Sequence, residues 1–412
     1  MRKTLITELV GIEKIQQARA RLEGVTEYTS MEYSRAITDR GGGPSYLKCE
    51  NLQRTGSFKI RGAYNRIALL SDEKRARGIV AASAGNHAQG VALASTLLGV
   101  KATVFMAEGA ALPKVEATTR YGANVILEGA VYDEAFAAAQ KFAEQEGAVM
   151  VHPFDHRDVI AGQGTIALEI LEQLPEAATL LIPVGGGGLI SGVAAAAKAL
   201  KPSIRIVGVE PDGAASVSRA LETGSVIPLE TLSTVADGLA TKQAGALCLT
   251  HVQHFVDQII TVNDEEISEA LLLIAERAKM IVEPAAAAGV AALISHRAEI
   301  KYPVVVLLSG GNIDPLLLIR VVRYGMGSAG RYFAFSTMLP DRAGELYRLS
   351  GVISRSGANV IGVEHRREGV ANRLLGDVEI SMQLETRGHE HIQSVIGQLE
   401  EAGYLVQTLK IS

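Results

Sequence analysis

The sequence predicts an α/β fold with parallel sheets, followed by a smaller α+β domain. Five short runs (GIVAAS, ATVFM, TLLIPV, IRIVGV and PVVVLLS) are almost wholly apolar and alternate with longer segments at helical spacing. Strands without polar alternation are buried on both faces, as in parallel sheets whose crossover helices cover each face. The region before residue 325 holds more strand–helix units than one compact core usually carries, so we expect two sheets there.

Helical periodicity is clear in two places. One apolar face, which predicts a continuous helix, is formed by Ile267, Leu271, Ile274, Ala278 and Ile281. At the amino terminus, residues 1–16 are positive at the tip, but an acidic residue interrupts the apolar stretch. We therefore expect a short amphipathic helix there rather than a signal peptide.

One segment has the length of a membrane span. Residues 177–197 carry no charged side chain. Pro183 and four consecutive glycines lie in its middle, so a strand, a glycine turn and the start of a helix explain the segment better. We expect no membrane insertion.

From Arg331 the pattern becomes that of an antiparallel sheet with one solvent-exposed face. Val378, Ile380, Met382 and Leu384 alternate strictly with polar residues. The apolar faces of two accompanying helices comprise Leu346, Leu349, Ile353, Ile392, Val395, Ile396 and Leu399. The order strand–helix–strand–strand–helix–strand is ferredoxin-like. With GMGSAG at 325–330 as the linker, we expect domains at residues 1–325 and 331–412.

Composition excludes several classes of protein. Hydrophobic residues make up 48% and charged residues 21% of the chain, which favours a large core over disorder. The 40 Lys and Arg against 45 Asp and Glu leave a net charge of −5, so we expect no nucleic acid and no anionic membrane as partner. Cys49 and Cys248 lie far apart without metal-ligand spacing, which excludes a disulfide framework and fits a reducing, cytoplasmic compartment.

The segment TGSFKIRGA, residues 55–63, is the first of four with a chemical interpretation. Lys59 follows apolar Phe58 and a glycine–serine turn. A lone lysine at the start of a helix is usually solvated. A lysine held in a dry pocket can instead become nucleophilic and form a Schiff base.

The second segment, SAGNHAQG at residues 83–90, follows the strand GIVAA directly. Small polar residues that open a helix at the end of a strand present N–H groups and hydroxyls to a small anion. The alternative is an ordinary helix cap by Ser83 or Asn86, and His87 can equally be a hydrogen-bonded structural histidine.

The third segment, PVGGGGLISG, places Gly185, Gly186, Gly187 and Gly188 between a strand and a helix. Glycines let the backbone approach a phosphate, and the amino end of the helix adds about 0.3–1 kcal/mol of favourable charge interaction when exposed. The same glycines, with Gly192, also approximate a dinucleotide fingerprint whose acidic partner would be Glu210. The loop alone does not separate these two ligands.

The fourth segment, LLSGGN, ends an apolar strand with Ser309. This serine can cap a turn or offer a neutral hydrogen-bond partner to a ring nitrogen. Together, the four segments supply an amine at Lys59, a phosphate cradle, a partner for a ring oxygen at Asn86 and one for a ring nitrogen at Ser309. Pyridoxal 5′-phosphate requires this set of groups.

The motifs NLQRTGSFKIRGA, SAGNHAQG, PVGGGGLISG, EPAAAAGVAAL and SGGN resemble, in order and spacing, the threonine dehydratases. These belong to the fold-type-II pyridoxal-phosphate enzymes, whose catalytic part has two α/β subdomains with parallel sheets like those of the tryptophan synthase β subunit. The resemblance covers nearly the whole chain. The segment LPDRAGELYRLSGVISRSGANV is similar to an ACT domain, a ferredoxin-like module that binds amino-acid effectors.

The resemblance implies a role for each site residue. It assigns to the cofactor Lys59, Phe58, Asn86, Gly185, Gly186, Gly187, Gly188, Leu189 and Ser309. It assigns to the substrate carboxylate Ser83, Gly85, Asn86 and His87. In this scheme Lys59 is the catalytic lysine, the glycines hold the phosphate, and Ser309 lies at the pyridine nitrogen.

The resemblance further implies β-elimination and deamination of L-threonine to 2-oxobutanoate and ammonia, with L-serine giving pyruvate. Serine racemases of the same fold carry a hydroxyl residue where this chain has Ala84, so a lyase is favoured over a racemase. A non-catalytic amino-acid sensor and a nicotinamide-dependent oxidoreductase are further alternatives, and the presence of Lys59 disfavours the sensor.

Two acidic residues and the regulatory module complete the expectations. We assign no metal site, although Glu210 could be a ligand of a divalent ion. Glu283 either pairs with the dipole at the start of a helix or contacts the cofactor. An ACT module implies an allosteric effector around residues 341–345 and 357–360, a homodimer or homotetramer, and a role in isoleucine biosynthesis rather than catabolism.

Overall fold

The computed structural model describes residues 9–367 and 376–409. Part of the expected amino-terminal helix, residues 1–8, lies outside this description, and helix α2 runs over Ile12–Leu22. Contacts divide the chain into two compact units, Met1–Pro315 and Leu316–Ser412.

Helix α15, Pro315–Ser328, begins where the two units divide, so the expectation of a linker at GMGSAG is wrong. The preceding run PLLLIRVV is apolar at helical spacing, and its Val321 is buried. Gly325 of the expected linker is buried in the same helix. The helical pattern of the preceding residues therefore outweighs the low helix propensity of two glycines.

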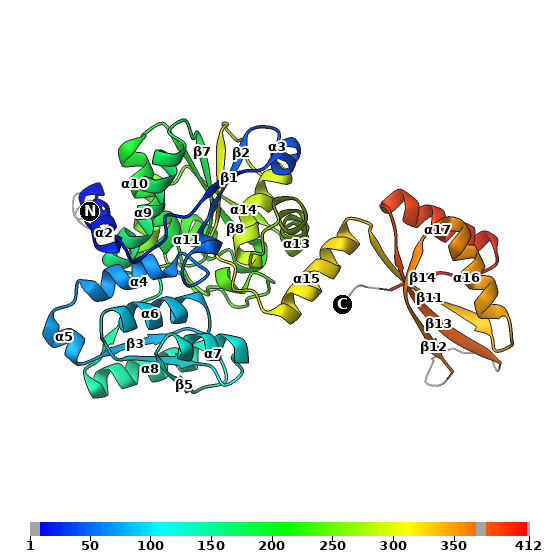
Figure 1. The fold of residues 1–412 in the computed structure, drawn as a ribbon, viewed down its shortest axis with the longest axis horizontal. Helices are drawn as coiled ribbons and strands as arrows, with labels where there is room; N and C mark the ends of the chain where they lie inside the picture. Colours follow the sequence, from blue (N-terminus) through cyan, green and yellow to red (C-terminus); the bar gives the residue numbers. More distant parts are fainter. Residues whose placement is uncertain (1–8, 368–375, 410–412) are drawn as a thin grey trace. The chain divides into compact units, whose positions relative to one another are not determined.

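The first unit contains two parallel sheets, which confirms the prediction (Figure 1). The larger has the strand order β1-β2-β10-β7-β8-β9, and β1 alone runs antiparallel to its neighbour within it. Its strands are β1 Met31–Tyr33, β2 Ser45–Cys49, β7 Thr179–Pro183, β8 Arg205–Pro211, β9 Gln258–Val262 and β10 Val304–Leu308. The apolar runs predicted β7, β8 and β10, whereas β2 and β9 carry Lys48, Gln258 and Thr261 and lack such a run.

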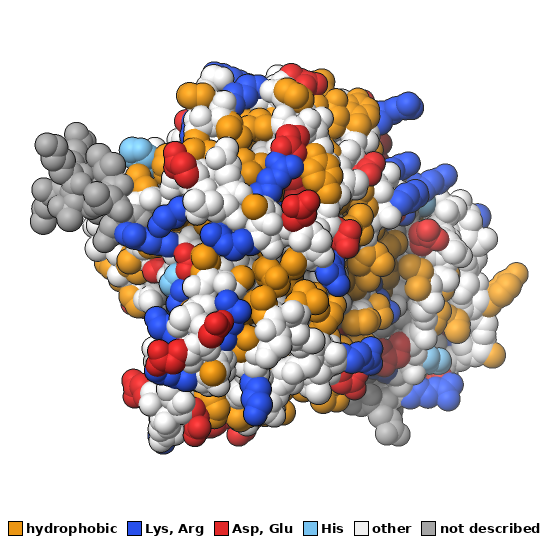
Figure 2. All heavy atoms as spheres, turned by 60° about the vertical axis from the view of Figure 1, so that its left-hand side comes forward, with side chains coloured by type: hydrophobic (Ala, Val, Ile, Leu, Met, Phe, Trp, Pro, Cys, Tyr) orange, Lys and Arg blue, Asp and Glu red, His pale blue; other side chains and the backbone are white. Residues whose placement is uncertain are grey.

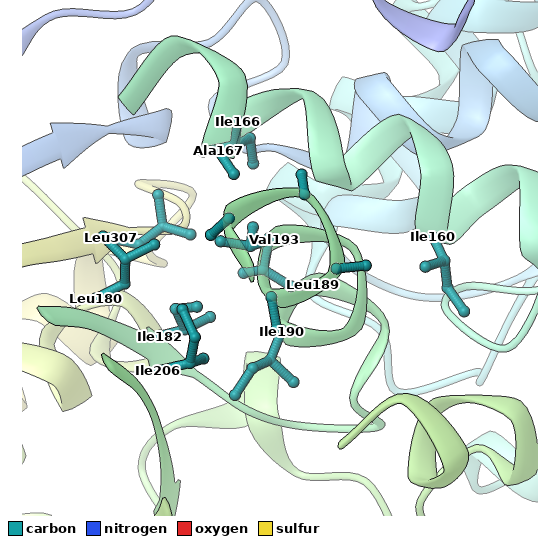
Figure 3. Close-up of a cluster of buried hydrophobic side chains, with 14 of the residues drawn as sticks. Ile160, Ile166, Ala167, Leu180, Ile182, Leu189, Ile190, Val193, Ile206 and Leu307 are labelled. Atoms are coloured by element: carbon teal, nitrogen blue, oxygen red, sulfur yellow. The ribbon is translucent and has the colours of Figure 1, made fainter. Parts of the chain in front are cut away.

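Helices cover both faces of this larger sheet. Helices α9, Arg157–Gln173, and α10, Gly188–Leu200, pack on one face. Figure 3 shows Leu180, Ile182, Ile206 and Leu307 of the strands facing Ile166 and Val193 of these helices. Helix α14, Pro284–Ile294, packs against β7, β8 and β10. It approaches closely at Gly289, where a Cβ atom would lie 2.7 Å from Val306 Cγ1.

The smaller sheet has the parallel order β5-β4-β3-β6. Its strands are β3 Ile79–Ala82, β4 Ala102–Met106, β5 Asn124–Leu127 and β6 Val149–Met150. Helices α4, Lys59–Ala68, and α6, Asn86–Leu97, form one core with it, and α8, Tyr132–Glu146, forms a second core. Further helices of the first unit are α3 Arg35–Gly41, α5 Asp72–Ala76, α7 Leu112–Arg120, α11 Ser216–Thr223 and α12 Ala246–Phe255.

The continuous helix expected through residues 267–281 is wrong at its carboxyl end. Helix α13 spans Asp264–Leu273 after a capping box formed by Asn263 and Glu266. A π-helical turn, Ile274–Ala278, follows, and Lys279 ends it with a φ of 60°. Ile281 is therefore outside the helix and 62% exposed.

The second unit confirms the ferredoxin-like order. Its elements are β11 Tyr332–Pro340, α16 Glu345–Ser356, β12 Asn359–Arg366, β13 Asp377–Glu385, α17 His389–Glu401 and β14 Gln407–Thr408. The antiparallel sheet has the order β12-β13-β11-β14, and the four alternating apolar residues of β13 are buried. Leu346 departs from the prediction, because it is 38% exposed at the start of α16.

Among residues 9–367 and 376–409, no helix is long and apolar enough to cross a membrane. Residues 177–197 form β7, the glycine turn and most of α10. On the face that Figure 2 shows, basic and acidic side chains are intermingled, with no extended patch of one sign.

Candidate active site

One cavity of the first unit, about 920 Å³ in volume, is lined by every residue that the sequence assigned to cofactor and substrate. It opens where β3, β7 and β10 end, because the carboxyl ends of parallel strands and the helices that follow them meet at such an edge. The four motifs, which are spread over 250 residues of sequence, therefore belong to one site.

Lys59 is the first residue of α4, and its start is tied to the end of β10. The N–H of Phe58 donates to the carbonyl of Ser309 at 3.1 Å, and Ser57 bridges Gly310. Lys59 Nζ donates to the carbonyl of Pro153 at 3.1 Å. Burial lowers the pKa of the Lys59 ammonium to about 8, against the opposing effect of the Glu283 carboxylate. An amine that loses its proton so readily can act as a nucleophile and as a base.

Arg61, two residues further along α4, fixes this helix in the core. Its guanidinium donates Nε and Nη2 to the two carboxylate oxygens of Glu50, both at 2.8 Å, and Nη1 to Glu169 at 2.6 Å. Lys48 also pairs with Glu169 at 2.6 Å. All four side chains are buried, so the network is a rigid support under the helix that carries Lys59.

The glycine loop presents unpaired N–H groups to the cavity. Gly187 is the N-cap of α10, so the N–H groups of Gly188, Leu189 and Ile190 have no acceptor inside the helix. Their partial positive charge favours an anion such as a phosphate.

Glycine is required in this loop for reasons of space and of backbone geometry. Gly187 has a φ of 94°, in the left-handed region. A Cβ atom at Gly186 would lie 2.4 Å from the ring of Phe154, and one at Gly188 would lie 2.7 Å from Phe154 Cβ. Phe154, which no sequence pattern identified, therefore packs closely against the loop and restricts these positions to glycine.

Asn86 begins α6, and its side-chain amide contacts the side chains of Glu283 and Asn312. Nδ2 donates to both carboxylate oxygens of Glu283, and Oδ1 accepts from Asn312 Nδ2 at 2.8 Å. Burial raises the pKa of the Glu283 carboxyl to about 7, although the hydrogen bond from Asn86 opposes the shift. Glu283 thus belongs to the cavity wall as well as preceding α14.

The loop between β3 and α6 offers backbone groups rather than the ring of His87. His87 Nε2 donates to the carbonyl of Val151 at 2.8 Å, and burial lowers the pKa of the ring to about 3. The interpretation as a structural histidine therefore describes its side chain. Ser83 Oγ accepts from the N–H of Gly85 at 3.2 Å, which shapes the turn into α6.

Ser309 follows β10 directly and is buried beside the Lys59 segment. It places a neutral hydroxyl in the cavity wall. Asn312, in the same turn, donates Nδ2 to the carbonyl of Thr55 at 2.7 Å and so connects this turn to the loop that precedes Lys59.

Several cavity residues could not be found from motifs. They are His152, Phe154, Lys114, Asp133, Asp237 and Lys242. Lys114 pairs with Asp237 at 2.7 Å, and Lys242 pairs with Asp133, so two ion pairs connect the smaller-sheet subdomain to the segment before α12. A charged pair far apart in sequence leaves no local signal.

Glu210, the possible metal ligand, is engaged by protein donors. Its carboxylate accepts from the N–H of Val217 and the N–H of Ser218, both at 2.8 Å, and from Ser218 Oγ at 2.6 Å. Within the described part of the chain, no group of three or more His, Cys, Asp or Glu side chains could hold a metal. The carboxylate caps the start of α11.

The residues present fit pyridoxal phosphate. Lys59 supplies an amine that burial makes less basic, the glycine loop supplies N–H groups that a Cβ atom would obstruct, and Ser309 supplies a neutral hydroxyl. These groups converge on one cavity that also has room for a small amino acid.

Comparisons with known proteins agree with this fit. A family model described as pyridoxal-phosphate dependent enzyme matches residues 22–310. The L-threonine ammonia-lyase of Thermotoga maritima is 44% identical over 399 residues, which cover 97% of this chain and 99% of that protein. The catabolic L-threonine dehydratase of Escherichia coli K12 is 40% identical over 309 residues, which cover 74% of this chain and 94% of that protein.

Solved structures share the fold. The processed form of threonine deaminase isoform 2 from Solanum lycopersicum matches with a TM-score of 0.74 at 36% identity, covering 78% of this chain and 88% of that one. Maize serine racemase matches with a TM-score of 0.73 at 39% identity, covering 76% of this chain and 96% of that one. Because one is named for deamination and the other for racemisation, fold similarity alone does not select the reaction.

Proposed function

The chain belongs to the pyridoxal-phosphate-dependent enzymes, and on this premise we propose that it deaminates L-threonine to 2-oxobutanoate and ammonia by β-elimination. The observation that carries the proposal is Lys59, an amine of lowered pKa in the same cavity as the glycine loop and Ser309. The Thermotoga maritima lyase, aligned over 97% of the chain, supports threonine as the substrate. L-Serine, which differs by one methyl group, is the second substrate and gives pyruvate.

Each cavity residue then has a role. When bound, pyridoxal phosphate supplies a conjugated ring that accepts the electron pair left at the α-carbon of the amino acid. Lys59 Nζ holds the cofactor and, once displaced by the substrate, takes the proton from the α-carbon. The N–H groups of the glycine loop hold the phosphate, Ser309 faces the ring nitrogen and Asn86 the ring oxygen. The turn from Ser83 into α6 orients the substrate carboxylate.

Ala84 and Ser309 favour elimination over racemisation and transamination. Ala84 lines the cavity and has no proton to give to the opposite face of the α-carbon. A neutral Ser309 leaves the ring a weaker electron acceptor than a carboxylate would, so loss of the β-hydroxyl competes well with return of the proton.

The second unit is proposed to be an ACT-like regulatory domain that binds an amino-acid effector. The Escherichia coli dehydratase aligns over 94% of its own length but only 74% of this chain, so about a quarter of this chain has no counterpart in that alignment. An added module that serves as a feedback sensor suits a role in isoleucine biosynthesis. Buried free thiols at Cys49 and Cys248 support a cytoplasmic location.

The proposed effector segments lie at opposite ends of α16. The helix has 12 residues, which span about 18 Å, more than one amino acid can bridge. Residues 341–345 and 357–360 can therefore share one effector only if they come from two copies of the unit. This geometry supports a homodimer or homotetramer.

Absorption and turnover test the catalytic proposal together. We expect a yellow protein whose band borohydride bleaches irreversibly, and 2-oxobutanoate from L-threonine. Lys59→Ala should lose both, while Lys74→Ala, on α5, should keep both. A colourless wild-type enzyme after incubation with pyridoxal phosphate, or a Lys59→Ala variant that turns over threonine, would refute the assignment.

A further inference from the structure

His152 is a cavity residue to which the proposed mechanism gives no task. It lies between β6 and α9, and its ring is held at right angles by two aromatic neighbours. The ring centroids of His152 and Phe154 are 4.6 Å apart with an interplanar angle of 87°, and those of His152 and Phe136 are 6.4 Å apart at 81°. Edge-to-face contacts of this kind fix the orientation of the ring.

The backbone fixes which nitrogen of His152 carries the proton. Nδ1 accepts from the N–H of Asp155 at 2.8 Å and from the N–H of Phe154 at 3.3 Å. A nitrogen that accepts two N–H groups is unprotonated, so the proton of the neutral ring is on Nε2. Over residues 9–367 and 376–409, Nε2 has no hydrogen-bond partner, and because His152 lines the cavity, this N–H is available as a donor to a ligand there.

The ring also stays neutral. Burial lowers the pKa of His152 to about 4, a net shift that the Asp155 carboxylate opposes and to which the nearby Lys59 ammonium contributes. His152 is therefore a donor of constant charge at any pH where the enzyme would work. It is next in sequence to Pro153, whose carbonyl accepts from Lys59 Nζ at 3.1 Å.

Several other polar groups of the cavity already have partners. Lys114 and Lys242 are paired with carboxylates, and the ring of His87 is bonded to Val151. The substrate carboxylate goes to the turn before α6 in the proposed function. The β-hydroxyl, which must leave, is the substrate group still without a donor.

We infer that His152 is a catalytic residue whose Nε2–H donates a hydrogen bond to the β-oxygen of the substrate as the Cβ–O bond breaks. The inference rests on the proposed function. The Cα–H bond breaks, its electron pair forms the Cα–Cβ double bond, and the Cβ–O pair leaves with the oxygen. The proton that Lys59 Nζ took from the α-carbon goes to that oxygen, so water departs, while His152 keeps its own proton. A fixed donor at an atom that gains charge stabilises the transition state.

Two variants separate the loss of the Nε2–H donor from disruption of the backbone turn that Nδ1 stabilises. His152→Asn keeps an oxygen where Nδ1 accepts the two N–H groups but removes the distant donor. His152→Gln keeps a distant N–H but weakens the turn. The matched control is His156→Asn, because His156 accepts from the N–H of Asp158 at 3.1 Å outside the cavity, and asparagine is a good N-cap.

The measurement compares L-threonine with β-chloro-L-alanine, because a chloride leaves without needing a donor. We expect kcat/KM of His152→Asn for threonine to fall by about 100-fold while that for β-chloroalanine stays unchanged. His152→Gln should recover part of the threonine rate, and His156→Asn should match the wild type with both substrates. Equal losses on both substrates, or none on threonine, would overturn the inference.

An independent readout needs no turnover. In cofactor-free enzyme labelled with ¹⁵N-histidine, the His152 resonances should show Nδ1 unprotonated and Nε2 protonated from pH 6 to 8. A proton on Nδ1 would overturn the inference. If the wild type eliminates from neither substrate, the proposed function fails instead, and the two failures are thereby distinguished.

Discussion

Asn86 Nδ2 donates to both oxygens of the Glu283 carboxylate, at 2.8 Å and 3.0 Å, and so joins the first residue of α6 to the residue that precedes α14. Helix α6 belongs to the smaller-sheet subdomain, and α14 packs on the larger sheet. The pair therefore connects the two subdomains inside the cavity and fixes the amide that we assign to the ring oxygen of the cofactor.

The Glu283 carboxylate should make stability depend on pH. Burial raises the pKa of Glu283 to about 7, above its ordinary value of 4.5, so the folded state favours the protonated acid. The stability this provides is fully present below pH 4.5 and is lost as pH rises through 7. At pH 8 the loss amounts to about 3 kcal/mol.

Glu283→Gln, which stays neutral, tests this linkage. Urea unfolding of the cofactor-free variant should show a higher free energy of unfolding than the wild type at pH 8, and a much smaller difference at pH 5. The same difference at both pH values would mean that the carboxyl is not the titrating group.

The motif residues line one cavity because each lies at the end of a regular element. Lys59 and Asn86 begin helices, Gly187 precedes a helix and Ser309 follows a strand, and the topology of a parallel sheet brings such positions to one edge. The ferredoxin-like order also followed from the strict alternation in β13.

What the sequence missed depends on contacts between distant residues. Lys48 and Glu169 are 121 residues apart, and each is an ordinary charged residue until burial pairs them. The segment that carries His152 and Phe154 has no periodicity, so its role in shaping the glycine loop is visible only in three dimensions. Most of the expected linker at residues 325–330 is helical because the apolar spacing before it extends the helix through two glycines.

Arg61 should be needed for the fold as well as for the position of Lys59. Arg61→Met leaves the carboxylates of Glu50 and Glu169 buried, with one guanidinium missing, and should lower the free energy of unfolding by about 3–5 kcal/mol. Adding Glu50→Gln should recover part of that loss, because it removes one unpaired charge. Chemical denaturation of each variant measures both effects.

An exposed ion pair provides the control for Arg61. Arg19 pairs with Glu172, and these side chains are 44% and 46% exposed. Arg19→Met should cost less than about 1 kcal/mol, because water already solvates both charges. Equal losses for Arg19→Met and Arg61→Met would contradict the role of the buried network.

Substitutions at Gly187 should separate the effect of charge from the effect of backbone strain on cofactor binding at the glycine loop. Its φ of 94° and the 2.9 Å that would separate its Cβ from Cys248 Cβ make any side chain unfavourable. Gly187→Asn measures that cost alone, since asparagine tolerates the left-handed region. Gly187→Asp has nearly the same shape but adds a charge, and should weaken pyridoxal-phosphate binding by about 100-fold beyond the Asn variant.

Equilibrium titration of cofactor-free Gly187→Asn and Gly187→Asp, followed by absorption, gives both dissociation constants. The added weakening should shrink for pyridoxal, which lacks the phosphate. If the two variants bind pyridoxal phosphate equally, the loop does not hold its anion.

Removing the second unit should leave threonine turnover intact and abolish its regulation by an amino-acid effector. A chain that ends at Asp314 stops before α15, whereas one that ends at Gly325 cuts that helix in its last turn and leaves exposed apolar residues such as Leu316. We expect the shorter chain to keep threonine turnover, because every cavity residue lies in the first unit. Isoleucine and valine, added in turn, should change the rate of the full chain and leave that of the truncated chain unaltered. An equal response in both chains would place the effector site in the catalytic unit and refute the regulatory role of residues 341–345 and 357–360.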